Sequence, residues 1–314
     1  MKTIHGIENF PADEASIVTI GTFDGVHLGH QQILKQLTDT SRKSKLKSVL
    51  LTFFPHPRMV LQPDIPMRLI QTIQERKKAL EKTGLDYLVI HPFSTTFSRL
   101  SADNYVKQIL VEQLNVQKVV VGYDHRFGRN RTASLEDMYH YADIYDFEVI
   151  EIDAKKIDST AVSSTKIRKA IDDGNIELAN TYLGQPFKLE GIVVHGDKRG
   201  RKLSYPTANI DLQNQHKIVP KQGVYLVKSK LKGDVIYGMM NIGTKPTFNT
   251  TMRSVEVHFL DWNGDLYGQV VQVELLKWVR EERKFKTIKE LQTQIQTDEH
   301  NCRASIPTSH ASYK

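Results

Sequence analysis

The spacing of apolar residues changes partway along the chain, and this change restricts the possible folds more than any other feature. Up to residue 183, short apolar runs alternate with segments of helical periodicity. The expected strands are Ile17–Ile20, Ser48–Phe53, Tyr87–His91, Lys118–Val121 and Glu148–Ile152, and the expected helices lie at about 28–42, 70–83, 101–113 and 134–143. Such alternation predicts an α/β domain with a parallel sheet and helices on both faces.

The second half of the chain has a different pattern. Helical segments at Ser164–Asp172 and Ile176–Leu183 end at Gly184-Gln185-Pro186, so we place the domain boundary there and expect domains 1–183 and 184–314. The apolar runs beyond it are short, alternating and separated by Gly and Pro: Leu189–Val194, Gly223–Lys228, Val235–Ile242, Ser254–Phe259 and Val270–Leu276. This spacing predicts an antiparallel barrel or sandwich. A helix at about Ile288–Gln296 closes the pattern.

Charge is distributed unevenly over the 314 residues. Residues 1–183 carry 23 basic and 23 acidic side chains, so the whole net charge of +7 belongs to 184–314. A basic half suits an anionic ligand, whether nucleotide phosphate, nucleic acid or an anionic membrane. The sequence has one cysteine, no signal-peptide core at its start and no apolar run of about 18 residues. We therefore expect a cytoplasmic protein with no membrane partner.

The segment Gly21–His30 reads G-T-F-D-G-V-H-L-G-H and joins an expected strand to an expected helix. His27 and His30 are three residues apart, which places both imidazoles on one face of the helix start. Free backbone N–H groups and the helix dipole favour phosphate at that end. The motif therefore predicts a phosphate site, although a plain helix start with surface histidines fits the motif alone.

Three further motifs follow other strands of the expected sheet. They are Phe54-Pro55-His56-Pro57, the loop Gly122–Arg131 and the segment Val162–Arg168. Because the carboxyl ends of parallel strands share one edge, the motifs should converge there. The chemistry that fits is nucleotidyl transfer, in which a phosphate oxygen attacks the α-phosphorus of a nucleoside triphosphate and pyrophosphate leaves. Positioning and charge stabilisation dominate such reactions.

A second candidate site lies in Gly191–Ile210, where a glycine-rich basic turn precedes Pro206-Thr207-Ala208-Asn209. Thr207 and Asn209 alternate with Ala208, so in a strand they face the same side. Their oxygens suit Mg²⁺ that also binds phosphate. Glu256 stands mid-strand among apolar neighbours, where a carboxylate near a hydroxyl could act as a general base. A solvated basic hairpin and an exposed strand glutamate remain the alternatives.

These motifs, taken in order, resemble the bacterial bifunctional riboflavin kinase/FMN adenylyltransferases, also called FAD synthetases. The matching segments in the first half are G-x-F-D-G-V-H-x-G-H, F-P-H-P, G-x-D-x-x-F-G and S-S-T-x-I-R; in the second half they include R-x-L-x-x-P-T-A-N, P-x-x-G-V-Y, N-I-G-x-x-P-T-F, E-x-H and D-L-Y-G. The resemblance covers about residues 15–300. His125 and Ser204 depart from the family pattern, which usually has Phe and Gly there.

The resemblance implies a Rossmann-like nucleotidylyltransferase domain followed by a six-stranded antiparallel barrel with a C-terminal helix. At the adenylyltransferase site it implies His27 and His30 as catalytic residues. ATP is then bound by Gly21, Phe23, Asp24, Gly25, His27, Gly29, His30, Ser163, Ser164, Thr165 and Arg168. FMN is bound by Phe54, His56, Pro57, Asp124, Arg126 and Phe127.

At the kinase site the resemblance implies that Glu256 deprotonates the ribityl 5′-hydroxyl and that Thr207 and Asn209 hold Mg²⁺. ATP and flavin are bound there by Gly196, Lys198, Gly200, Arg201, Leu203, Pro206, Thr207, Asn209, Tyr225, Asn241 and Arg280. The expected cofactor is Mg²⁺ with ATP as co-substrate at both sites. The expected partners are riboflavin, FMN, FAD, ATP, ADP and pyrophosphate. We expect no nucleic-acid partner, and a monomer or weak homo-oligomer.

Two other classes of function remain open from the sequence. The H-x-G-H motif also occurs in class I aminoacyl-tRNA synthetases, but this chain is short and has no K-M-S-K-S-like segment. A non-catalytic RNA-binding or regulatory protein is compatible with the basic second half. A test for flavin products separates both from the flavin enzyme.

Overall fold

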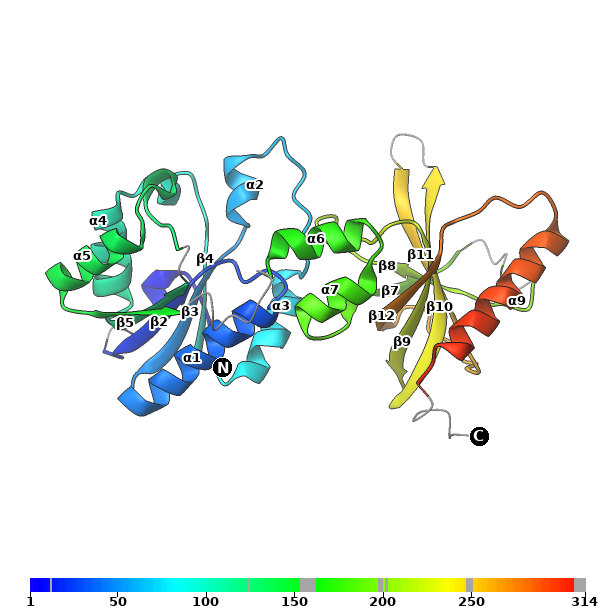
Figure 1. Ribbon diagram of the computed structural model, residues 1–314, viewed down its shortest axis with the longest axis horizontal. Helices are drawn as coiled ribbons and strands as arrows, with labels where there is room; N and C mark the ends of the chain where they lie inside the picture. The colour runs from blue at the N-terminus through cyan, green and yellow to red at the C-terminus, as the bar shows by residue number, and fades with distance from the viewer. Residues whose placement is uncertain are drawn as a thin grey trace. The chain divides into compact units, whose positions relative to one another are not determined.

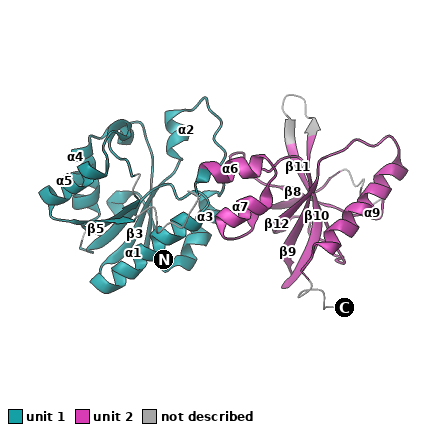
Figure 2. Cartoon of the chain, in the orientation of Figure 1, with its two compact units in different colours: residues 1–164 teal, residues 165–314 magenta. Residues whose placement is uncertain are grey.

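The computed structural model describes residues 1–11, 13–122, 125–152, 162–196, 200, 203–246 and 251–307. The side chains of residues 245, 246, 251 and 252 lie outside this description. The chain forms two compact units, residues 1–164 and 165–314 (Figure 2). Each unit has its own sheet and its own buried core.

The first unit is built on a six-stranded sheet (Figure 1). Its strands are β1 (Lys2–His5), β2 (Ser16–Ile20), β3 (Lys47–Phe53), β4 (Tyr87–His91), β5 (Val116–Gly122) and β6 (Glu148–Ile152). They lie in the order β1-β4-β3-β2-β5-β6, and every neighbouring pair is parallel. The predicted parallel sheet is confirmed. The edge strand β1 was not predicted, because its four residues carry a single buried side chain, Ile4.

Helices cover both faces of this sheet, as predicted. They are α1 (Leu28–Ser44), α2 (Pro57–Leu61), α3 (Ile73–Leu80), α4 (Ala102–Asn104) with a π-helical continuation at Tyr105–Gln113, and α5 (Leu135–Tyr145). Short 3₁₀ turns occur at Ile7–Asn9, Glu81–Thr83, Phe97–Arg99 and Arg129–Arg131. One core joins Leu34, Leu37 and Leu80 to the sheet, and the other joins Val106, Leu110 and Met138 to its opposite face. Burial on both faces explains the apolar runs of the central strands β2, β3 and β4.

The start of α3 differs from the sequence prediction for a local reason. The helix was expected from about residue 70 but begins at Ile73. Thr72 caps it by accepting a hydrogen bond from the backbone N–H of Glu75, whose carboxylate accepts in return from the N–H of Thr72. This capping box fixes the first turn. Residues 70 and 71 precede the helix, and their backbone N–H groups donate to the carboxylate of Asp24.

Two helices, α6 (Ser164–Asp172) and α7 (Ile176–Leu183), lead into the second sheet. Gly184 ends α7 with a left-handed backbone, φ 71°. The side chain of Asn180 donates to the carbonyl of Leu275 and accepts from the N–H of Phe187. The second unit begins at Thr165, so it includes α7 and all of α6 except its first residue. The functional boundary at 183/184 stays a prediction.

The second unit is a closed six-stranded barrel. Its strands are β7 (Phe187–Val194), β8 (Ala208–Asp211), β9 (Gly223–Leu231), β10 (Asp234–Pro246), β11 (Thr251–Phe259) and β12 (Val270–Arg280). Every neighbouring pair in the closed order β10-β11-β8-β7-β12-β9 is antiparallel. The barrel alternative is confirmed over the sandwich. The strand β8 was not predicted, because its sequence, Ala-Asn-Ile-Asp, has no apolar run.

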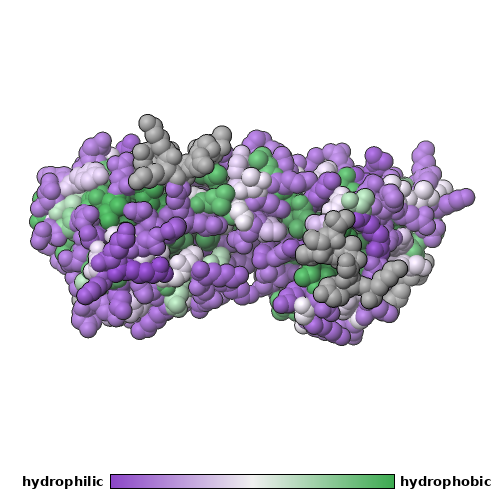
Figure 3. All heavy atoms as spheres, turned by 60° about the horizontal axis from the view of Figure 1, so that its bottom comes forward, coloured by the Kyte–Doolittle hydropathy of each residue, from purple (hydrophilic) through white to green (hydrophobic). Residues whose placement is uncertain are grey.

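The C-terminal helix α9 (Ile288–Ala304) packs on this barrel (Figure 1). Its fully buried Cys302 lies in a small apolar cluster with Leu226, Met239 and Leu260. No helix among the residues described is long and apolar enough to cross a membrane. Hydrophilic side chains cover most of the face in Figure 3, with apolar patches among them.

Candidate active sites

The sheet of the first unit has a natural ligand position at its centre. The chain passes from β2 to β3 on one side and from β5 to β6 on the other, while β2 and β5 are themselves neighbours. A crevice forms outside the carboxyl ends of two such strands, because their connections diverge. The Gly21–His30 segment, which we call the phosphate loop, leaves β2 at this point.

The two histidines of the phosphate loop lie face to face at the start of α1. His27 caps the helix, with its Nδ1 atom accepting a hydrogen bond from the backbone N–H of His30 at 3.3 Å. Their rings stack with centroids 3.6 Å apart, and the ring of Phe23 stacks on His30 at 4.4 Å. The Nδ1 atom of His30 is buried and has no hydrogen-bond partner among the described residues. A buried polar atom of this kind suits a ligand group.

The environment of His30 keeps its imidazole neutral. Burial lowers the pKa of His30 well below 6.5, and the nearby His27 and Arg76 lower it further. A neutral imidazole offers one N–H donor and one acceptor, so it can orient a phosphate oxygen without adding a full charge.

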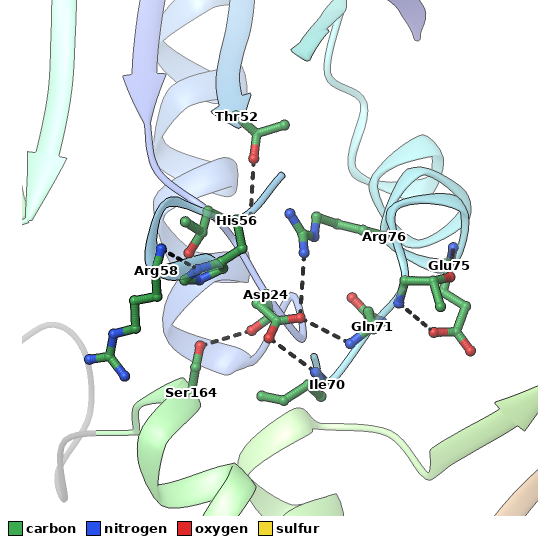
Figure 4. Close-up of polar contacts among 11 residues, drawn as sticks. Asp24, Thr52, His56, Arg58, Ile70, Gln71, Glu75, Arg76 and Ser164 are labelled. Atoms are coloured by element: carbon green, nitrogen blue, oxygen red, sulfur yellow. Dashed lines mark hydrogen bonds and ion pairs between the residues drawn. The ribbon is translucent and has the colours of Figure 1, made fainter. Parts of the chain in front are cut away.

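Asp24 was predicted to bind ATP, but its carboxylate is fully buried against the protein (Figure 4). One oxygen accepts the backbone N–H of Ile70 at 3.0 Å, and the other accepts that of Gln71 at 2.9 Å. The guanidinium of Arg76 lies 3.5 Å from the latter oxygen. The geometry therefore commits Asp24 to contacts within the chain.

The F-P-H-P segment lies beside the phosphate loop. The hydroxyl of Thr52, at the end of β3, donates to the carbonyl of Thr22 at 3.2 Å (Figure 4). His56 caps α2 by accepting the N–H of Arg58 at its Nδ1 atom, and Pro57 occupies the first helical position. Phe54 is 44% exposed. An accessible ring next to a phosphate loop suits a planar ligand.

The third motif places Phe127 among aromatic residues of the core. Phe127 is buried, with its ring 5.8 Å from that of Tyr105 and 6.4 Å from that of Tyr141. The ring of His125 is nearly parallel to that of Phe127, with centroids 6.0 Å apart. His125 thus occupies an aromatic position with another flat ring. Arg126 is exposed, and the predicted Asp124 lies outside the described residues.

The S-S-T-x-I-R segment begins α6. The hydroxyl of Ser164, the last residue of the first unit, donates to the backbone carbonyl of Asp24 at 2.9 Å. Ser163 precedes the helix, and Thr165 and Arg168 lie in its first two turns. Gly21, Gly25 and Gly29 belong to the phosphate loop itself, where Gly25 has φ 96°.

In the barrel, register alone places three predicted polar residues in a row. Glu256 on β11 pairs with Asn241 on β10 and with Asn209 on β8. Paired residues on neighbouring strands point to the same face. The hydroxyl of Thr207, just before β8, lies 3.4 Å from Oε2 of Glu256. Carboxylate, hydroxyl and amide oxygens are thus gathered on one wall of the barrel.

This oxygen-rich wall fits Mg²⁺ by its donor set, because hydroxyl and amide oxygens are hard ligands. Gly196, two residues after β7, lies close to this wall. A Cβ there would lie only 2.2 Å from the side-chain nitrogen of Asn209. At Gly200 a Cβ would lie 2.2 Å from the carbonyl oxygen of Tyr205. The backbone contact excludes a side chain at Gly200, whereas a side chain at Gly196 would displace the amide of Asn209. The predicted Lys198 and Arg201 lie outside the described residues.

The segment that carries Leu203 and Pro206 contacts α9 through Tyr205. The phenol of Tyr205 donates to Glu299 at 2.8 Å, and Nδ1 of His258 lies 2.8 Å from the carbonyl oxygen of Pro206. A cavity of about 610 Å³ opens here, lined by residues 203–205, the end of β11 and the polar side of α9. A hydrogen bond from Tyr205 to the C-terminal helix thus holds the residues before Thr207 in place.

Two predicted kinase-site residues form contacts with other parts of the chain. Tyr225 is fully buried, with its hydroxyl donating to the carbonyl of Lys221 and its ring edge-on to Trp278. Arg280 forms a forked ion pair with Asp298 of α9, with its Nη2 atom at 2.6 Å. Their part in ligand binding stays a prediction.

Sequence reasoning missed Arg76, which the structure brings next to both Asp24 and His30. A signal was present in the helical spacing. Arg76 lies three residues after Ile73 and four before Leu80, on the face that points into the core. A charged residue at a core position of an amphipathic helix indicates a buried partner.

Comparison with known proteins agrees with two activities on one chain. The family model for FAD synthetase matches residues 9–166, and that for riboflavin kinase matches residues 183–306. The bifunctional riboflavin kinase/FMN adenylyltransferase of Listeria monocytogenes is 37% identical, with 97% of this chain and 98% of that protein covered. Its Bacillus subtilis counterpart is 39% identical, with 95% and 96% covered.

A solved structure is also similar over nearly the whole length. It is a protein from Streptococcus pneumoniae described as a macrolide-efflux protein, with a TM-score of 0.87 and 33% identity. The alignment covers 96% of this chain and 98% of that one. The arrangement of a parallel sheet followed by a closed barrel is therefore shared with an experimentally solved chain.

Proposed function

Since this chain belongs to the bifunctional riboflavin kinase/FMN adenylyltransferase family, with FAD synthetase in its N-terminal half and riboflavin kinase in its C-terminal half, we propose how its own residues divide the two reactions. Residues 1–183 adenylylate FMN to FAD with release of pyrophosphate. Residues 184–314 phosphorylate riboflavin to FMN with release of ADP. Both use ATP.

In the kinase reaction, Glu256 accepts the proton of the ribityl 5′-hydroxyl as that oxygen attacks the γ-phosphorus of ATP. Thr207, Asn209 and Asn241 orient the reactants around this carboxylate. Mg²⁺ held by Thr207 and Asn209 would neutralise the charge on the transferring phosphoryl group. The row of Asn209, Glu256 and Asn241 across three paired strands is the observation that supports this assignment most strongly.

In the adenylyl transfer, His27 and His30 hydrogen-bond to the triphosphate of ATP where negative charge builds on the leaving pyrophosphate. The buried, unpartnered Nδ1 atom of His30 supports this role. The start of α6, with Ser163, Thr165 and Arg168, supplies further donors for phosphate. Phe54, His56, Pro57, Asp124, Arg126 and Phe127 bind FMN, for which the accessible ring of Phe54 is the supporting feature.

We also propose a cytoplasmic location, on the ground that one thiol suits a reducing compartment. The chain acts as a monomer or weak homo-oligomer, without a nucleic-acid or membrane partner.

The test is to incubate the purified chain with riboflavin, ATP and Mg²⁺ and to separate the flavins by chromatography, then to repeat the assay with FMN as substrate. We expect FMN and FAD from riboflavin, and FAD from FMN. RNA binding with a steep salt dependence and no flavin product would instead favour a regulatory nucleic-acid-binding protein.

A further inference from the structure

Asp24 lies inside the phosphate loop, yet its carboxylate cannot reach a substrate. Its side chain has no exposed area. Both of its oxygens accept backbone N–H groups, from Ile70 and Gln71, and one also faces Arg76. Its own carbonyl accepts the hydroxyl of Ser164. Asp24 therefore joins the phosphate loop to the residues before α3 and to Ser164 (Figure 4).

We propose that Asp24 and Arg76 are positioning residues for adenylyl transfer, whose buried ion pair fixes the shape of the loop that presents His27 and His30. This inference rests on the function proposed above for the N-terminal site. It replaces the sequence-based view of Asp24 as an ATP contact, and it gives Arg76 a role that no motif indicated.

The backbone of the phosphate loop is strained, so it needs contacts that hold its conformation. Phe23 has φ 48° and Val26 has φ 41°, so the non-glycine residues on both sides of Asp24 adopt left-handed backbone conformations. Positive φ is rare for a β-branched residue such as Val26. Strain of this kind persists only where surrounding contacts over-determine the conformation. Asp24 lies within this strained segment and carries the contacts that hold it.

Arg76 also acts on the histidines directly. Its side chain is 2% exposed, and its positive charge helps to lower the pKa of His30, together with burial and His27. His27 and Arg76 are the charged or titratable groups that the structure shows acting on His30, and Asp24 balances the charge of Arg76. The ion pair therefore sets both the place and the protonation of the histidine.

The first test is kinetic and uses the full chain. Asp24→Asn and Arg76→Gln should each lower kcat/KM for FAD formation from FMN by about 10- to 100-fold, since small misplacements of reacting groups cost about that much. Arg76→Lys, which keeps the charge, should recover part of the loss. The matched control is Asp39→Asn, which breaks an exposed ion pair with Lys35 on α1 and should change kcat/KM less than twofold.

Formation of FMN from riboflavin by the same preparations serves as an internal check on protein quality. Amide hydrogen exchange in β2 and β3 shows whether the first unit stays folded in each variant. Unchanged kcat/KM in both Asp24→Asn and Arg76→Gln overturns the proposal.

The second test does not depend on catalysis. Titration of His30 by NMR should give a higher pKa in Arg76→Gln, because a nearby positive charge is removed, and no higher pKa in Asp24→Asn, because a negative charge is removed. A site that simply opens to water would raise the pKa of His30 in both variants, and that result overturns the proposal. If the wild-type chain makes no FAD, the proposed function is wrong, while this titration still decides the role of the ion pair.

Discussion

The ion pair between Arg280 and Asp298 gives the sharpest test of how the barrel and its C-terminal helix are held together. The Nε and Nη2 atoms of Arg280 approach both carboxylate oxygens of Asp298 at 2.6 to 3.0 Å. The two side chains are only 15% and 4% exposed. Gln294 donates a further hydrogen bond to the same carboxylate. Asp298→Asn would leave the guanidinium without its counter-charge in a nearly dry site.

Removing one partner of a buried pair costs about 3–5 kcal/mol, so we expect Asp298→Asn to lower the free energy of unfolding of the second unit by about 3 kcal/mol. With a urea m-value of about 2 kcal/mol per molar, the midpoint should fall by about 1.5 M. Both tryptophans, Trp262 and Trp278, belong to the second unit, so their fluorescence follows its unfolding alone.

The control is Asp261→Asn, which breaks an ion pair with Arg303. The side chain of Asp261 is 73% exposed. We expect the midpoint to change by less than about 0.3 M there, because exposed pairs contribute little. A shift in Asp298→Asn as small as in this control would refute the reasoning. Arg280 would then contribute little to holding α9, and the ligand-binding role that the family resemblance implies would be favoured.

Further predictions concern single side chains. Ser204 has φ 64°, so Ser204→Val should lower the urea midpoint of the second unit, whereas Ser204→Gly should not; equal effects would contradict this. Burial raises the pKa of Cys302 to about 12, so a disulfide-exchange reagent at pH 8 should label it only after unfolding, and rapid labelling of the native chain would contradict its placement. Because the folded pKa of His30 lies below its ordinary 6.5, the stability contributed by the neutral ring is full above pH 6.5 and is lost as the pH falls below it. Urea midpoints of the first unit should therefore decline below that pH, and less so in His30→Asn. Tyr205→Phe removes the bond to Glu299 and should raise the KM for ATP in FMN formation by about 2- to 10-fold without changing FAD formation from FMN; an equal effect on both reactions would contradict the bracing role.

The parts of the fold that sequence predicted are those with a repeating local signal. The buried strands β2, β3 and β4 contain apolar runs, and α1 follows a glycine-rich turn. The short strands β1 and β8 have no apolar run. They form because they pair with other strands, β1 with β4 and β8 with β7 and β11. Their existence depends on contacts distant in the sequence.

The candidate sites show the same limit. Strand alternation predicted that Thr207 and Asn209 share a face, whereas their closeness to Glu256 depends on the pairing of β8 with β11. The role of Asp24 could not be read in this way. Its partners Ile70 and Arg76 lie 46 and 52 residues further along the chain, and only the folded structure shows that they fill its hydrogen-bonding capacity.

We propose that one chain holds two separate sites, one built around Glu256 and the other around His27 and His30. The most direct measurement mixes two variants, Glu256→Gln and the double variant His27→Ala/His30→Ala, with riboflavin, ATP and Mg²⁺. We expect the first alone to make no FMN, the second alone to stop at FMN, and the mixture to make FAD. A mixture that still fails to make FAD, or a Glu256→Gln chain that makes FMN at the normal rate, would contradict the account.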